Sequence, residues 1–183
     1  MKNKIRTTAL ALTSLIAMLS VLNAQADEDL RTEAQSALGD FLKKDSTLKT
    51  FLTNSAGYAI FPSVGKGGFI VGGARGKGLV YEKDNVVGET TMTQASVGAQ
   101  VGGQTFAEII FFESPAAFED FKASKFEMSA EASAVAAAEG ASTAAKYTGG
   151  VAVFTLPKKG LMVQASIGGQ KFKFEALKQP EAK

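Results

Sequence analysis

A stretch of alternating glycines and short apolar triplets, Gly57 to Tyr81, constrains the fold of this chain more than any other feature. Triplets such as Phe69-Ile70-Val71 and Leu79-Val80-Tyr81 are rich in β-branched and aromatic residues, which is typical of strands. Because glycine adds no packing energy and weakens a strand, so many glycines indicate tight turns, bulges or the close approach of another backbone or ligand. We expect the glycine-rich segment 72–78 to form a bend or a hairpin tip.

The first 26 residues have the pattern of a secretory leader. Lys2, Lys4 and Arg6 form a positive segment, an apolar run follows from Ala9 to Leu22, and Ala24-Gln25-Ala26 has the small-x-small pattern of a cleavage site. The apolar run is short for a transmembrane helix, which needs about 20 residues. We therefore expect residues 1–26 to be a cleaved signal peptide and residues 27–183 to form a single exported domain, periplasmic or secreted.

Composition excludes several classes of function. The chain has 183 residues without Cys or His, so disulfides, a lipid-modified cysteine, the common general base and the usual zinc ligands are absent. Loss of the leader would remove three of the 20 basic residues and none of the 18 acidic ones, which leaves a formal net charge of −1. Overall charge therefore gives no support for a nucleic-acid partner. No nucleotide-binding motif fits the glycines, and we expect no enzymatic activity, cofactor or metal.

Periodicity predicts the elements of the mature chain. An amphipathic helical pattern covers 27–52 with a break at Asp45-Ser46, and its apolar stripe either packs on a sheet or contacts lipid. Ser114-Pro115 has the pattern of a helix start, with Phe118 and Phe121 on the buried face. Further strands are expected before Pro62, over 91–101, 106–112, 151–156 and 161–167, and around Phe172 and Phe174, with turns at 83–85 and 157–160 and a frayed tail from Lys178.

Glu108 interrupts the otherwise apolar run from Phe106 to Phe112. A carboxylate in such a run is either at an edge that faces water or buried and paired, and we favour the edge. Together these elements predict an α+β fold, a strongly bent glycine-rich antiparallel sheet or partial barrel with N-terminal and mid-chain helices packed on it.

Basic residues among the glycines form the candidate binding site. Arg75 and Lys77 flank Gly76 at the expected tip, where bare amide groups and cations together would hold a phosphate. Lys66 joins them only if the chain bends at Gly72-Gly73, and Lys158 with Lys159, on a second expected turn, is an equally suitable partner for the cluster. The alternative is that these lysines only keep hairpin tips soluble.

Five glycine-containing motifs follow one another along the chain: Gly57-Tyr-Ala-Ile-Phe-Pro62, Gly65-Lys-Gly-Gly-Phe69, Gly72-Gly-Ala-Arg-Gly76, Gly78-Leu-Val-Tyr81 and Gln94-Ala-Ser-Val-Gly98. Together these motifs resemble the SYLF domain, and the resemblance covers about residues 34–174. The resemblance implies peripheral binding to phospholipid membranes and no catalytic activity. Because this chain lacks the fused domain of eukaryotic relatives, their phosphoinositide preference and actin binding are not carried over.

We therefore expect non-enzymatic binding of an anionic phospholipid surface, at Lys66, Arg75, Gly76, Lys77, Lys158 and Lys159. The alternative is a small outer-membrane β-barrel or structural envelope protein, which export, glycine content and alternating strands also fit.

Overall fold

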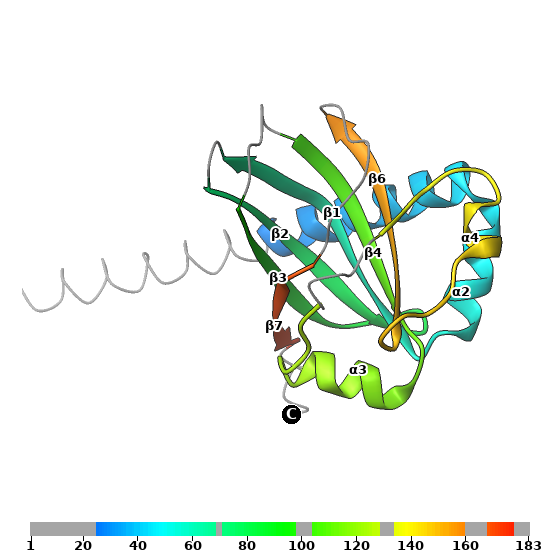
Figure 1. Ribbon diagram of the computed structural model, residues 1–183. Helices are drawn as coiled ribbons and strands as arrows, with labels where there is room; N and C mark the ends of the chain where they lie inside the picture. The colour runs from blue at the N-terminus through cyan, green and yellow to red at the C-terminus, as the bar shows by residue number, and fades with distance from the viewer. Residues whose placement is uncertain (1–24, 69–70, 98–103, 129–133, 160–167, 178–183) are drawn as a thin grey trace, which may run out of the picture.

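The computed structural model describes residues 25–68, 71–97, 104–128, 134–159 and 168–177, and its strands form one sheet in the order β5-β6-β4-β1-β2-β3-β7 (Figure 1). The sheet is open, with β5 and β7 at its edges, and every strand pair is antiparallel except β5 with β6. The strands are β1 (Gly57–Gly68), β2 (Val71–Glu82), β3 (Asn85–Val97), β4 (Gln104–Phe112), β5 (Val135–Ala136), β6 (Val151–Lys159) and β7 (Gln170–Ala176).

The helices follow the sequence prediction closely. The N-terminal helix covers residues 25–44, and the predicted break at Asp45 is confirmed. Asp45 caps the next turn by accepting a hydrogen bond of 3.0 Å from the Thr47 amide. Ser114 caps α3 as predicted. The remaining helices are η1 (Ser46–Leu48), α2 (Lys49–Asn54), α3 (Pro115–Lys122) and α4 (Ala141–Ala144), and none of the described helices is long and apolar enough to cross a bilayer.

The two faces of the sheet bury separate hydrophobic cores. On one face, side chains of β1, β4 and β6 pack against η1, α2 and the N-terminal helix, which passes behind the sheet in Figure 1. On the other face, phenylalanines of β1, β4 and β7 pack against Phe118 and Phe121 of α3. The predicted amphipathic helix therefore packs its apolar stripe on the sheet, which agrees with the first of the two alternatives. The architecture is α+β, as predicted.

The sheet is strongly curled toward the α3 side. The rings of Phe61 in β1 and Phe172 in β7 lie 5.9 Å apart, although β2 and β3 separate these strands in the sheet. In a flat sheet three strand spacings of about 4.8 Å would hold them about 14 Å apart. The curl makes the α3 face concave and confirms the bent, partly closed sheet that the sequence predicted.

The prediction of a bend or tip at residues 72–78 is wrong, because this segment lies inside β2 and pairs with β1 and β3 on both sides. The antiparallel pairing of β1 with β2 runs from Tyr58 with Tyr81 to Gly68 with Gly72. The glycines serve the close approach of neighbouring strands instead. A Cβ atom on Gly78 would lie 2.6 Å from the carbonyl oxygen of Ile60, which no side chain tolerates.

Two proline-based predictions are also wrong. Pro62 does not end the first strand, because the register of β1 shifts between Ile60 and Ser63, and a bulge there accommodates the proline. Likewise Pro157, Lys158 and Lys159 continue β6 instead of forming a turn, and Pro157 pairs with Phe106 beside a second register shift. The expected turn at 83–85 is confirmed between β2 and β3. The predicted strand 161–167 and the tail from Lys178 lie outside the described residues.

The strand predicted over 91–101 is confirmed as far as Val97, within β3, where Met92 and Gln94 are buried while Thr93 and Ala95 are exposed. The expected position of Glu108 at an edge is wrong, because β4 lies between β1 and β6 and this side chain is fully buried. Curling of the sheet supplies its hydrogen-bond partner, Gln170 of β7, which no local pattern reveals. The second reading, a buried and paired carboxyl group, is the correct one.

Candidate functional site

Register brings four cationic side chains onto one face of β2, β3 and β7. Arg75 pairs with Thr93, which pairs with Lys171, so the three residues form one row across the sheet. In the next row on the same face, Lys77 pairs with Thr91, which pairs with Lys173. The four cations are Arg75, Lys77, Lys171 and Lys173, all exposed. We call this set the four-cation site.

The spacing of the four-cation site suits a small anionic group. With strands about 4.8 Å apart and one face repeating about every 6.7 Å, the four Cα atoms mark a rectangle of roughly 10 by 7 Å. Long, flexible Arg and Lys side chains can converge from its corners on one phosphate, and two threonine hydroxyls lie along its middle. The four cations line a hollow of about 490 Å³ together with Glu89, Thr90, Thr91, Thr93, Phe172 and Glu175.

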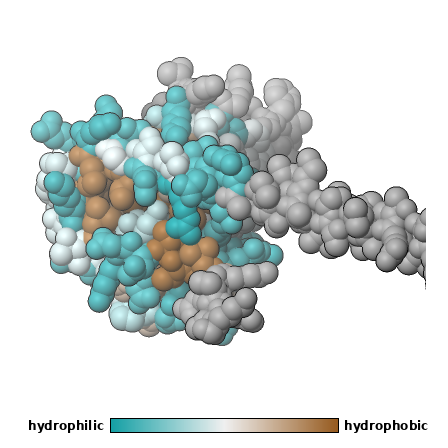
Figure 2. Space-filling view, turned by 180° about the vertical axis from the view of Figure 1, so that it is seen from behind, coloured by the Kyte–Doolittle hydropathy of each residue, from teal (hydrophilic) through white to brown (hydrophobic). Residues whose placement is uncertain are grey.

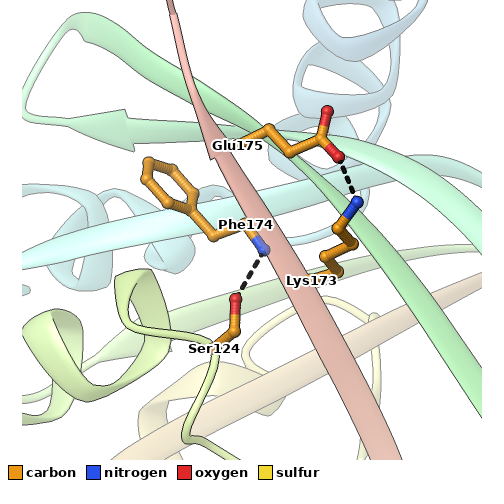
Figure 3. Close-up of polar contacts among 4 residues, drawn as sticks. All are labelled: Ser124, Lys173, Phe174 and Glu175. Carbon is orange, nitrogen blue, oxygen red and sulfur yellow. Dashed lines mark hydrogen bonds and ion pairs between the residues drawn. The ribbon is translucent and has the colours of Figure 1, made fainter.

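Alternation along β7 separates its charged and apolar side chains. Figure 3 shows Lys173 and Glu175 on one side of the strand and Phe174 on the other. The Phe174 amide donates a hydrogen bond of 3.0 Å to the Ser124 hydroxyl, and Met128 donates through its amide to the carbonyl of Gln170. The segment after α3 therefore covers the outer edge of β7 and fixes the strand that carries two of the four cations.

The four cations differ in how far neighbouring carboxylates neutralise them. Lys171 lies 3.0 Å from Glu127, and Lys173 lies 2.7 Å from Glu175. In the part of the chain that the structure describes, neither Arg75 nor Lys77 forms an ion pair within 4 Å. The positive charge available to a ligand is therefore concentrated on β2.

A carboxylate row closes one end of the hollow. Glu89 of β3 pairs with Glu175 of β7, one row beyond Lys77 and Lys173. Partial burial raises the pKa of Glu89, the carboxyl group of Asp27 at the start of the N-terminal helix raises it further, and Lys77 opposes the rise. The pKa of Glu175 is lowered by its hydrogen bond and ion pair with Lys173. Positive and negative charges therefore occupy different ends of one hollow.

The structure separates the residues that the sequence analysis grouped. Arg75 and Lys77 do lie together, but in the middle of a strand and not at a tip. Gly76 between them is buried and paired on both sides, so its amide is not an exposed anion ligand as expected. Lys66 pairs with Ala74, so it belongs to the opposite face, where its charge acts on Glu108.

The lysine pair of β6 is remote from Arg75. Lys159 pairs with Thr105, and two strands, β4 and β1, lie between β6 and β2, which corresponds to about 14 Å. Instead, Lys171 and Lys173 of β7 lie in the same rows as Arg75 and Lys77, and neither of these two lysines was predicted as a site residue. A signal was present, since Arg75-Gly-Lys77 and Lys171-Phe-Lys173 both place cations at every second position of a strand.

Within the described residues, no three His, Cys, Asp or Glu side chains are grouped as metal ligands would be. The charged hollow gathers four cations on one face of the sheet, and we assign a binding function to it for that reason.

The comparisons with known proteins agree on one family. The model of the family described as Ysc84, Las17-binding protein actin regulator, matches residues 93–176. The chain is also 31% identical over 146 residues to beta cell expansion factor A of Aeromonas veronii, a SYLF-family protein. Over these residues the chain is similar to the SYLF family. The predicted resemblance is thereby confirmed.

The alignment with the Aeromonas veronii protein covers 78% of this chain and 55% of that relative, so the chain spans about half of the relative's length. The family-model match includes only the last five residues of β3, but all of β4, β6 and β7. It therefore contains Lys171 and Lys173, whereas Arg75 and Lys77 precede it.

Proposed function

We propose that this SYLF-like chain is exported and binds anionic phospholipid membranes peripherally, without catalysing a reaction. The observation that carries the proposal is the four-cation site, in which exposed Arg75 and Lys77 stand beside Lys171 and Lys173 on one face of the sheet. Each cationic side chain near an anionic bilayer contributes about 1 kcal/mol. A guanidinium group adds bidentate hydrogen bonding to phosphate.

Local arrangement matters here because the chain has little overall charge. With 20 basic and 18 acidic residues, attraction to an anionic surface depends on gathering cations in one place. Among the described residues on the face that Figure 2 shows, the hydrophobic ones form separate patches enclosed by hydrophilic ones. A surface of this kind favours contact through charges at the headgroup level.

Flotation with vesicles of phosphatidylglycerol in phosphatidylcholine tests the proposal. The double variant Arg75→Glu with Lys77→Glu should bind at least about 30-fold more weakly, the loss expected from removing two such cations. Wild-type binding should also weaken as salt rises from 50 to 300 mM, because salt screens exposed charges. The matched control is Lys158→Glu with Lys159→Glu, which changes the net charge equally and should retain most of the binding. Equal loss in both double variants would remove β2 from the site.

The proposed export has its own test. Expressed with its leader in a bacterium with an outer membrane, the protein should be recovered from the periplasm or medium, and its N-terminal sequence should begin at Asp27. Recovery only as the uncleaved chain would contradict export by this leader.

A further inference from the structure

The hollow contains carboxylates as well as the four cations. Along the β2–β3–β7 face, two rows with cations at both ends are followed by a row that contains Glu89 and Glu175. Asp27 adds a third carboxyl group beside Glu89. The cations and these carboxylates nearly cancel, so a plain anion is attracted at one end of the hollow and repelled at the other. A ligand with a negative and a positive group would satisfy both ends.

We infer that this hollow recognises a phosphoethanolamine group, with the phosphate among Arg75, Lys77, Lys171 and Lys173 and the primary ammonium at Glu89 and Glu175. The inference rests on the function proposed above and specifies the headgroup at the same site. Anionic lipids supply the general attraction to the bilayer, and the zwitterionic headgroup makes the short-range contacts.

The dimensions of the group fit the rows. Four bonds of about 1.5 Å join phosphorus to the ammonium nitrogen, so these atoms lie at most about 6 Å apart. The row of Lys77 and Lys173 and the row of Glu89 and Glu175 are two residues apart along the strands, which is about 6.7 Å. Both charged ends of the ligand can therefore meet partners in neighbouring rows when the phosphate lies at the row of Lys77 and Lys173, which the long side chains of Arg75 and Lys171 can reach from the next row.

The chemistry at the acidic end favours a primary ammonium over a quaternary one. A primary ammonium donates three hydrogen bonds, and the oxygens of Glu89 and Glu175 accept them. A quaternary ammonium donates none and is usually held by aromatic rings. Among the described residues that line the hollow, the sole aromatic is Phe172, whose side chain is buried in the opposite, concave core. A bound ammonium would also offset the negative charge that Asp27 and Glu175 place beside Glu89.

Two sets of measurements on the full mature chain test the inference. In the first, vesicles hold a fixed fraction of phosphatidylglycerol, and the remainder is either phosphatidylcholine or phosphatidylethanolamine. Wild type should bind the second kind roughly tenfold more tightly, the worth of one charge-assisted hydrogen bond. Glu89→Gln should abolish this difference between the two zwitterionic lipids. Glu175→Gln, at an exposed position, serves as a second variant if Glu89→Gln does not fold, and Glu82→Gln, in the β2–β3 hairpin, is the matched control.

In the second set, amide chemical shifts are followed during titration with soluble O-phosphoethanolamine, phosphocholine and inorganic phosphate. Shifts at Thr91, Thr93 and Lys171 with phosphoethanolamine alone support the inference, even if vesicle binding fails and overturns the proposed function. Binding to phosphatidylglycerol with no preference between the two zwitterionic lipids, or equal shifts with phosphocholine, overturns the inference and leaves the proposed function intact.

Discussion

The side-chain amide of Gln170 in β7 donates a hydrogen bond of 3.1 Å to a carboxylate oxygen of Glu108 in β4, although three strands separate β7 from β4 in the sheet. The bond crosses the concave face and links the middle of the sheet to its edge. Because β7 also carries Lys171 and Lys173 on its other face, the buried pair helps to hold two of the four cations in place.

The first prediction concerns Glu108. Complete burial raises its pKa from 4.5 to about 7, while Gln170 and Lys66 oppose the rise. Since the folded pKa lies above the unfolded one, this carboxyl group favours the folded state fully below about pH 4.5. That stabilisation is lost as pH rises through 7. Wild type should therefore melt at a lower temperature at pH 8 than at pH 5.5.

Glu108→Gln keeps the shape of the side chain without its charge, so the loss of stability between pH 5.5 and 8 should be smaller. At pH 8 the variant should be the more stable protein, by at most about 3 kcal/mol. Thermal unfolding followed by circular dichroism measures both effects. Parallel pH profiles for wild type and variant would show that Glu108 is not the group responsible.

The second prediction concerns the glycines of β2. A Cβ atom at Gly78 would lie 2.6 Å from the Ile60 carbonyl oxygen and 2.7 Å from the ring of Phe61. Gly78→Ala should therefore lower the free energy of unfolding by about 1–3 kcal/mol, the usual cost of overpacking. Gly65→Ala is the matched control, because nothing lies within 4 Å of its Cβ position. In urea titrations Gly65→Ala should match or slightly exceed wild type. Equal losses in the two variants would contradict a role for close approach.

These glycines also show how far the sequence alone could lead. The density of these glycines correctly indicated an unusual backbone arrangement, and the close approach of another backbone was one of the predicted causes. The choice of a turn over a strand was nevertheless wrong, because β-propensity depends on neighbouring strands that a local pattern does not contain. Helix boundaries at Asp45 and Ser114 were predictable, since capping uses only nearby residues.

The candidate site was half predictable for the same reason. Arg75 and Lys77 are two residues apart, so their common face follows from strand geometry. Their approach to Lys171 and Lys173 depends on β3 pairing with β7 after a long excursion of the chain. The burial of Glu108 likewise depends on the curl of the sheet. Such long-range pairings leave no periodic signal in the sequence.

The third prediction concerns Asp45, whose carboxylate accepts amide hydrogen bonds from Thr47 (3.0 Å), Gly140 (3.3 Å) and Ser142 (2.8 Å). It joins the end of the N-terminal helix to α4. Asp45→Ala leaves these amides without their acceptor in a buried place, which should cost about 2–4 kcal/mol in urea unfolding. Asp40→Ala, on the exposed side of the same helix, removes only a surface pair with Lys43 and should cost less than about 0.5 kcal/mol.

The pH dependence of Asp45 has the opposite sign to that of Glu108. Burial alone would raise its pKa, but hydrogen bonds from Thr47 and Ser142 outweigh burial and hold the pKa below 3.8. The stabilisation is therefore present above pH 3.8 and lost as pH falls through the lowered pKa. The difference in stability between wild type and Asp45→Ala should shrink on acidification below pH 3.8, and a difference that is constant down to pH 2 would contradict this account.

The last prediction uses the ion pair of Lys171 with Glu127, which are 3.0 Å apart and both exposed. If the four-cation site holds phosphate, Glu127 competes with the ligand for Lys171, so Glu127→Gln should tighten binding to phosphatidylglycerol vesicles about threefold to tenfold. Stability should hardly change, because an exposed ion pair contributes less than about 1 kcal/mol.

Glu119→Gln is the matched control. It removes the same charge from an ion pair of 2.7 Å with Lys122 on α3, away from the hollow. If only net charge governed attraction to the bilayer, both variants would gain equally in affinity. A gain confined to Glu127→Gln, measured by flotation at a single salt concentration, would tie binding to the freed ammonium of Lys171. Equal gains would instead reduce the four-cation site to one part of a diffuse electrostatic attraction.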